Sequence, residues 1–225
     1  MIRAVVFDFD GTIADTIPAI RAGLNMTMRE LGYPEHSLAG VRSFINYGAR
    51  NLVRSALPAE YREDEAHVDR VLDLYESFYG QTYLQTKEAY DGIPALIEEL
   101  HSQHGVKIGV LSNKEHMFVV NLVDQVLLPN TFEAVQGNIP SKPAKPHPYL
   151  SNLVAESLGV APEECVMVGD SDVDIRTAHN ANMTHVGVSW GYRDENTLRE
   201  NGANLIARDV CELRKILLDL IEQKG

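Results

Sequence analysis

Two aspartates, Asp8 and Asp10, stand at the end of an apolar run in the segment AVVFDFDGT, residues 4–12. Side chains alternate between the faces of a strand, so these carboxylates would point the same way if the strand continued. Like charges at close range raise each other's pKa unless a cation lies between them. A turn is the plain alternative, since Asp, Gly and Thr are common turn residues. The sharper hypothesis is a metal-binding nucleophile site at the carboxyl end of a parallel strand.

Further polar residues follow three later apolar runs that we expect to be strands: Ser112, Asn113, Lys142, Lys145, Asp170 and Asp174. Each has a plain structural explanation on its own. Ser112 with Glu115 fits a helix-capping pattern, loop lysines are commonly solvated, and aspartates cap helices and favour their first turns. Because parallel strands place their ligands at their carboxyl ends, the shared location of these residues favours a single site.

Strand-like and helix-like runs alternate along most of the chain. We expect strands at 2–9, 105–112, 132–137, 164–170 and 183–189, with a weaker one at 202–207, and helices at 93–103, 114–127, 148–159, 172–181 and 209–223. This alternation predicts an α/β fold, a Rossmann-like doubly wound parallel sheet with helices on both faces.

Residues 16–86 interrupt the alternation, because they contain no strand-like run. Their periodicity predicts helices near 18–32, 48–58 and 63–85. We therefore predict an inserted all-α helical cap domain at 16–86 and a core domain formed by 1–15 and 87–225. A helical module directly after a candidate active-site turn is typical of a lid or a substrate-selecting cap, although it is also compatible with a purely structural subdomain.

Composition and charge restrict the class of protein. The chain has 225 residues, 44% hydrophobic and 23% charged, which is typical of a globular protein. A formal net charge of -12 argues against nucleic acid or an anionic membrane as partner, since both bind basic surfaces. The first apolar run contains Asp8 and lacks a signal-peptide cleavage pattern, and Cys165 and Cys211 are too few for a disulfide framework. We expect a cytoplasmic protein, a monomer or a homodimer.

Four segments in a fixed order carry a resemblance to a known family. DFDGT, LSN, a lysine before PHP, and GDSDVD resemble the four motifs of the haloacid dehalogenase superfamily of phosphohydrolases, and the match spans residues 7–174. The helical insertion is similar to the first cap type of that superfamily. The segments WGY, at 190–192, and KPHP also resemble the phosphoglycolate phosphatase branch.

The resemblance implies a role for each matched residue. Asp8 would be the nucleophile that forms an aspartyl-phosphate, and Asp10 would act as general acid and base. The phosphoryl group would be bound by Gly11, Thr12, Ser112, Asn113 and Lys145. Lys145 is preferred to Lys142 only because it matches the KPHP motif. The implied cofactor is Mg²⁺, held by Asp8, Asp170 and the backbone carbonyl of Asp10, with Asp174 outside the direct ligands.

The implied reaction is Mg²⁺-dependent hydrolysis of a small phosphorylated metabolite, with 2-phosphoglycolate as the leading candidate. Asp10 argues against a haloacid dehalogenase, and Lys87, at the very end of the cap, argues against a phosphonatase that uses a cap lysine. A β-phosphoglucomutase-like phosphotransfer, a pyrophosphatase and a catalytically silent binding protein remain alternatives. In the cap, we hypothesise that Arg50 faces the substrate and binds a carboxylate, although it is equally compatible with a surface position.

Overall fold

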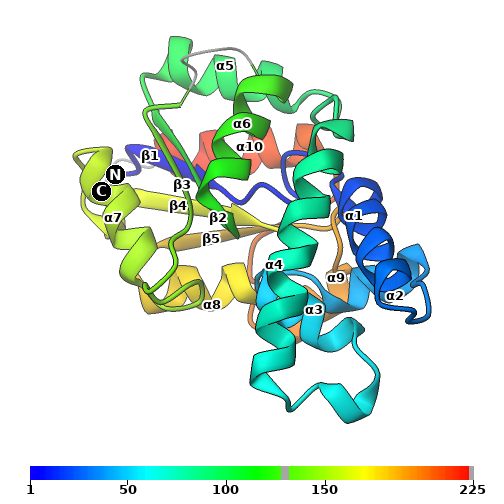
Figure 1. Cartoon of the computed structure of the whole chain (residues 1–225). Coiled ribbons are helices and arrows are strands. Elements are labelled where there is room, and N and C mark those ends of the chain that lie inside the picture. The colour runs from blue at the N-terminus through cyan, green and yellow to red at the C-terminus, as the bar shows by residue number, and fades with distance from the viewer. Residues whose placement is uncertain (128–131, 223–225) are drawn as a thin grey trace.

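The computed structural model describes residues 1–127 and 132–222. Within these residues, six strands form one parallel sheet in the order β3-β2-β1-β4-β5-β6 (Figure 1). The strands are β1 (Ala4–Phe7), β2 (Lys107–Glu115), β3 (Ala134–Asn138), β4 (Cys165–Gly169), β5 (Thr184–Val188) and β6 (Ile206–Ala207). The chain runs outward from β1 in one direction and then in the other, so the order of strands reverses beside β1. In such sheets the crevice at the carboxyl end of the reversal point is where ligands bind.

Helices cover both faces of the sheet, as the sequence predicts for a doubly wound fold. They are α5 (Ile93–His104), α6 (His116–Val126), α7 (Tyr149–Ser157), α8 (Asp172–Asn180), α9 (Glu195–Glu200) and α10 (Val210–Glu222), with a short 3₁₀ helix η3 (Pro162–Glu164). Val5 and Phe7 of β1 pack in the same apolar cluster as residues of α5 and α10, whereas Ala4 and Val6 pack with α7. Burial on both faces explains why β1 is a continuous apolar run.

Between β1 and α5 the chain is helical, as predicted. The elements are α1 (Ile17–Glu30), α2 (Leu38–Phe44), α3 (Ala49–Ala56), η1 (Ala59–Tyr61), α4 (Glu65–Thr82) and η2 (Tyr83–Gln85). In Figure 1 these helices gather at the end of the sheet toward which the strands point. They share an apolar core that includes Leu24, Met28 and Tyr75, and Phe118 of α6 joins it from the sheet side. The division of the chain at residues 16 and 86 stays a prediction.

A glycine sets how closely the two longest cap helices pack. A Cβ atom on Gly23 of α1 would lie 2.9 Å from the Tyr79 Cα atom of α4. No real side chain tolerates that distance from backbone, so the absence of a Cβ lets the helices touch. Tyr79 is thereby held where α4 faces the core, and its ring packs edge-on against Phe118 at a centroid distance of 4.9 Å.

The ends of two strands differ from the prediction. Strand β1 stops at Phe7 rather than continuing to Phe9, and β2 continues to Glu115, beyond the expected end at Ser112. The extension of β2 pairs Glu115 with Asn138 of β3 after an irregularity in register. Helix α6 consequently begins at His116 rather than near residue 114. The final helix ends at Glu222, and position 223 of the predicted helix lies outside the described residues.

None of the helices in the described ranges is long and apolar enough to cross a membrane.

Candidate active site

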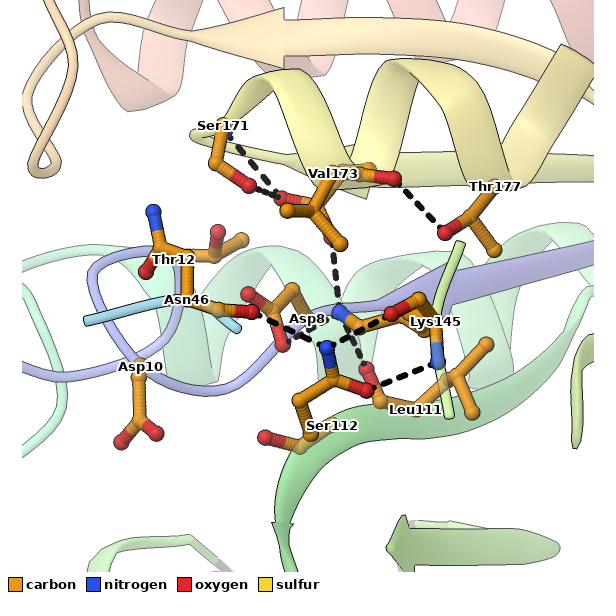
Figure 2. Close-up of polar contacts among 12 residues, drawn as sticks. Asp8, Asp10, Thr12, Asn46, Leu111, Ser112, Lys145, Ser171, Val173 and Thr177 are labelled. Carbon is orange, nitrogen blue, oxygen red and sulfur yellow. Dashed lines mark hydrogen bonds and ion pairs between the residues drawn. The ribbon is translucent and has the colours of Figure 1, made fainter. Parts of the chain in front are cut away.

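The chain turns sharply after β1, and this turn separates the two aspartates. The Asp8 amide donates to the Val168 carbonyl of β4 at 2.8 Å, and the Ile13 amide then donates back to the Phe9 carbonyl at 3.0 Å. Because the strand does not continue, Asp8 and Asp10 do not share one direction. In Figure 2 Asp8 lies beside Lys145, whereas Asp10 extends away from that pair.

Lys145 lies at the centre of a buried charged cluster. Its Nζ is 2.9 Å from Asp8 Oδ1, 2.7 Å from Asp174 Oδ1 and 3.1 Å from the Leu111 carbonyl. The lysine side chain is only 2% exposed. Burial disfavours the charged ammonium of Lys145, but the carboxylates of Asp174 and Asp8 outweigh it and raise the lysine pKa above its ordinary value. Lys145 is therefore held as a cation beside the candidate nucleophile.

Lys142 lies elsewhere, although it belongs to the same loop. Its Nζ is 5.4 Å from the centroid of the Tyr149 ring, and the side chain is exposed. The geometry thus brings Lys145, and not Lys142, to Asp8.

Asp174 is tied to the start of its own helix as well as to Lys145. Its Oδ2 accepts from the Ser171 amide at 3.1 Å and from the Ser171 hydroxyl at 2.6 Å. Gly169 permits this arrangement, since a Cβ atom there would lie 2.3 Å from the Asp174 Cγ atom. Asp174 therefore connects Lys145 to the start of α8, and its place outside the direct metal ligands stays a prediction.

Asp170 is fully buried and is held by the two loops beside it. Its Oδ2 accepts from the Tyr192 amide at 2.6 Å, and its Oδ1 lies 3.4 Å from the Thr12 hydroxyl that donates to it. Gly11 has a φ of +82°, and a Cβ atom on it would lie 2.5 Å from Asp170 Oδ2. Glycine is required at this position both by the left-handed backbone and by the space that the carboxylate occupies.

Burial and mutual repulsion disfavour the charged forms of the carboxylates in this cluster. Asp8, Asp170 and Asp174 each offer an oxygen, and these atoms lie within 4.8 Å of one another. Burial raises the pKa of Asp8 from 3.8 to about 7, although Lys145 opposes the shift. Burial also raises the pKa of Asp170 well above 3.8, and the negative charges of Asp174 and Asp8 add to it. A cation among these oxygens would oppose both effects, because it favours the charged forms.

The carboxylate oxygens of this cluster are ligands of the kind that a hard divalent cation binds. The buried Asp8 Oδ1 makes an ion pair with Lys145 at 2.9 Å, and it has no aligned hydrogen bond among the described residues. Buried oxygens normally have hydrogen-bond partners, so Asp8 Oδ1 retains the capacity to bind a metal ion. Mg²⁺ takes oxygen ligands from a few carboxylates. The residues fit the predicted ion, with Asp8 and Asp170 as candidate ligands, while the role of the Asp10 carbonyl stays a prediction.

Ser112 and Asn113 are buried at the end of β2, beside this cluster. Asn113 Oδ1 accepts from the Lys145 amide at 2.8 Å, and its Nδ2 donates to the Lys145 carbonyl at 3.0 Å and to the Asn46 carbonyl at 2.9 Å. Asn113 thus connects β2, the lysine loop and the cap. Its predicted contact with a phosphoryl group stays a prediction, as does that of Ser112, whose Oγ accepts from the Lys114 amide at 3.2 Å.

Asp10 faces the cap. Its Oδ1 accepts from the Thr16 hydroxyl at 2.6 Å and lies 3.1 Å from Lys114 Nζ. Lys114 also donates to the Tyr79 hydroxyl of α4 at 2.8 Å. We did not single out Lys114 from the sequence. Its position directly after Asn113, at the carboxyl end of a strand next to β1, was the signal available to find it.

The segment at 190–192 supports the first turn. The Tyr192 hydroxyl accepts from the Thr16 amide at 2.8 Å, and Trp190 Nε1 donates to the Thr12 carbonyl at 3.3 Å. Tyr192 is 5% exposed. These aromatic residues therefore hold the turn that carries Asp8 and Asp10.

A small cavity of about 60 Å³ lies between the cap and the carboxyl end of β2. Asp10, Asn113 and Lys114 line it from the core, and Leu52 and Tyr79 line it from the cap. Its walls join the candidate acid and base to apolar cap residues, so a small molecule is the ligand that fits.

Arg50 lies outside this cavity. Its guanidinium pairs with Glu65 Oε2 at 2.5 Å and with Asp69, all three on the cap, and its side chain is 42% exposed. These contacts give Arg50 a position on the cap surface, and the hypothesis that it faces the substrate gains no support from them.

Comparisons with known proteins agree with this geometry. The family described as Haloacid dehalogenase-like hydrolase matches residues 5–188. A phosphoglycolate phosphatase from Pseudomonas putida is 31% identical over 214 residues, which cover 94% of this chain and 78% of that protein. A phosphoglycolate phosphatase from Vibrio parahaemolyticus is 30% identical over 222 residues, which cover 96% of each chain.

Solved structures show the same architecture. A candidate phosphoglycolate phosphatase from Lactobacillus delbrueckii subsp. bulgaricus has a TM-score of 0.87 and 28% identity, covering 96% of this chain and 98% of that one. A β-phosphoglucomutase from Clostridium difficile has a TM-score of 0.77 at 21% identity, covering 98% and 97%. The second likeness concerns the fold alone.

Proposed function

This chain belongs to the haloacid dehalogenase-like hydrolases and is a phosphatase, and we propose that it hydrolyses 2-phosphoglycolate with Mg²⁺, through an aspartyl-phosphate on Asp8. The observation that carries the proposal is the environment of Asp8. This buried carboxylate pairs with the buried Lys145 at 2.9 Å and lies within reach of the carboxylates of Asp170 and Asp174.

Asp8 acts as the nucleophile in this proposal. Its carboxylate oxygen forms a bond to phosphorus while the bond from phosphorus to the ester oxygen breaks, and the electron pair leaves with that oxygen. A Mg²⁺ ion held by Asp8 and Asp170 would neutralise part of the phosphate charge and so permit one anion to approach another. Lys145 adds a fixed positive charge beside the reacting carboxylate.

Asp10 supplies and later removes the proton. As the ester bond breaks, a proton passes from the Asp10 carboxyl to the leaving oxygen, giving the alcohol product. The resulting carboxylate then takes a proton from the water that attacks the aspartyl-phosphate, which releases phosphate and restores Asp8. The Thr16 hydroxyl, at 2.6 Å, holds the Asp10 carboxyl toward the cavity.

The choice of 2-phosphoglycolate is supported by the relatives named phosphoglycolate phosphatase and by the small volume of the cavity. A β-phosphoglucomutase-like phosphotransfer or a pyrophosphatase would use the same core residues. A catalytically silent binding protein would show no turnover at all. These alternatives are therefore outcomes of the test rather than separate proposals.

The test is phosphate release from a panel of 2-phosphoglycolate, sugar phosphates, nucleotides and pyrophosphate, with Mg²⁺ and again with EDTA. We expect release that requires Mg²⁺ and the highest kcat/KM for 2-phosphoglycolate. Asp8→Asn should abolish turnover, and Asp10→Asn should greatly reduce it with the fold intact. Asp219→Asn on the exposed face of α10 is the matched control and should retain full activity.

Each other outcome points to a different protein. Robust turnover by Asp8→Asn would reject the covalent step. A folded wild-type chain that converts β-glucose 1-phosphate without net phosphate release would be a mutase. A folded chain that acts on no compound would be a binding protein.

A further inference from the structure

Lys114 is a buried lysine that the mechanism above does not use. Its side chain is 6% exposed, and its Nζ lies between Asp10 Oδ1 of the core, at 3.1 Å, and the Tyr79 hydroxyl of the cap, at 2.8 Å. The same Nζ is 4.8 Å from the centroid of the Tyr79 ring. An ammonium group enclosed in this way gives up hydration, so its placement calls for an explanation.

The charged groups that line the cavity leave one position, at Lys114, where an anionic group of a substrate would be favoured. Among the described residues that line the cavity, Lys114 is the cation, and the other charged groups are Asp10, Glu76 and Glu115. Much of the remaining wall is apolar. A second negative charge on a substrate would therefore be favoured at Lys114 and disfavoured at the three carboxyl groups.

An ammonium group has three N–H donors, and the hydrogen bond to the Tyr79 hydroxyl uses one of them. The contact with Asp10 Oδ1 at 3.1 Å is an ion pair, so Lys114 keeps N–H donors for a ligand in the cavity. Because Lys114 contacts the Asp10 carboxyl group that would protonate the leaving group, its ammonium lies near the place of the leaving oxygen. In 2-phosphoglycolate only one carbon atom separates the carboxylate from that oxygen, so the two groups lie close together in the substrate as well.

We propose that Lys114 binds the carboxylate of the substrate and so selects phosphate esters that carry a carboxylate one carbon from the ester oxygen. The inference rests on the proposed function. It names the group in this chain that distinguishes 2-phosphoglycolate from phosphate esters whose alkyl group is uncharged. Tyr79 of α4 orients the lysine from the cap side. Substrate selection therefore takes place where cap and core meet.

The experiment compares kcat/KM for 2-phosphoglycolate and for ethyl phosphate, which lacks only the carboxylate function. Lys114→Met should lower kcat/KM for 2-phosphoglycolate by about 10- to 100-fold, the range for losing a hydrogen bond between charged groups. The loss for ethyl phosphate should be clearly smaller, because that ester has no carboxylate to lose, so the ratio of the two kcat/KM values should fall. Lys215→Met removes an exposed lysine of α10 and is the matched control, with no change expected for either ester.

The wild-type chain gives a second readout that needs no folded variant. Glycolate should inhibit hydrolysis of ethyl phosphate more strongly than ethylene glycol does, because only glycolate carries the carboxylate. Equal inhibition by the two compounds would overturn the inference.

The remaining outcomes separate the two proposals. An equal loss on both esters in Lys114→Met would mean that the lysine acts only by positioning Asp10, and the inference would fail while the hydrolase stands. A wild-type chain with no preference for 2-phosphoglycolate over ethyl phosphate would overturn the inference and the choice of 2-phosphoglycolate as substrate, while the phosphatase activity itself would stand. A folded wild-type chain that hydrolyses no phosphate ester would reject the proposed function and the inference with it.

Discussion

Lys145 and Asp174 form an ion pair that is closed to water, with 2.7 Å between Nζ and Oδ1 and with side chains 2% and 0% exposed. Such a pair is costly to bury and costlier to break, because removal of one partner leaves the other charge without compensation. In this site Lys145 also faces Asp8, so one cation serves two buried carboxylates.

Lys145→Met should therefore destabilise the fold as well as stop catalysis. We expect the free energy of unfolding to fall by roughly 3 kcal/mol in EDTA near neutral pH. Lys142→Met is the matched control from the same loop, and its exposed side chain predicts a loss below about 1 kcal/mol. Urea unfolding of both variants measures the difference. Equal losses would show that the buried pair adds nothing beyond an ordinary surface lysine.

Gly11→Ala tests whether the first turn is shaped for Asp170. The new methyl group would lie 2.5 Å from Asp170 Oδ2, so we expect weaker binding of Mg²⁺, seen as a smaller rise in Tm on adding the ion. Gly32→Ala is the control, because Gly32 also has a positive φ, of +71°, but a Cβ atom added there would meet no described atom within 4 Å. Both variants should lose about 1 to 2 kcal/mol of stability from the left-handed backbone. The same response to Mg²⁺ in both would contradict a role of Gly11 at the metal site.

The alternation of apolar runs and amphipathic helices was enough to predict the α/β class, and the helical insertion followed from the absence of strand-like runs. The residues at the carboxyl ends of β1, β2 and β4 were predictable because a parallel sheet brings those ends together. Lys145 was chosen by resemblance, and its contacts with Asp8 and Asp174 agree with that choice.

Contacts between segments far apart in the chain were not predictable from residue types. Lys114 looked like an ordinary lysine at a helix start, and only the packing of α4 against the core shows that Tyr79 covers it. Arg50 had the right chemistry for a carboxylate, but its direction depends on how α3 and α4 pack. Periodicity gives the face of a helix that is buried, and it does not say which charged side chain reaches across a domain boundary.

Arg50→Ala decides whether that arginine contributes to substrate binding. The contacts of its guanidinium with Glu65 and Asp69 on the cap surface predict an unchanged KM for 2-phosphoglycolate. The loss in free energy of unfolding should stay below about 1 kcal/mol, as for other exposed ion pairs. Steady-state kinetics over the substrate panel provides the measurement. A clear rise in KM that is confined to substrates with a carboxylate would instead favour the sequence-based hypothesis for Arg50.

His185 of β5 is a partly buried histidine whose two ring nitrogens are buried and lack hydrogen-bond partners among the described residues. Burial lowers its pKa from 6.5 to about 4, although the charge of Asp174 opposes the shift. The folded chain therefore keeps His185 neutral where the unfolded chain protonates it. His185 therefore leaves the free energy of unfolding unchanged above about pH 6.5. As the pH falls from there toward 4, protonation of the unfolded chain progressively lowers the free energy of unfolding.

His185→Leu should remove this dependence on pH. Between about pH 7.5 and about pH 5, the wild-type chain should lose roughly 1 to 2 kcal/mol more of its free energy of unfolding than the variant does. The raised pKa values of Asp8 and Asp170 act in the opposite direction, but they are present in both chains and cancel in the comparison. His101→Leu, which removes a 43% exposed histidine of α5, is the matched control for the loss of a histidine. Urea unfolding in EDTA at the two pH values measures these free energies of unfolding. If wild type and His185→Leu lost the same amount between the two pH values, His185 would take up its proton in the folded chain as readily as in the unfolded chain.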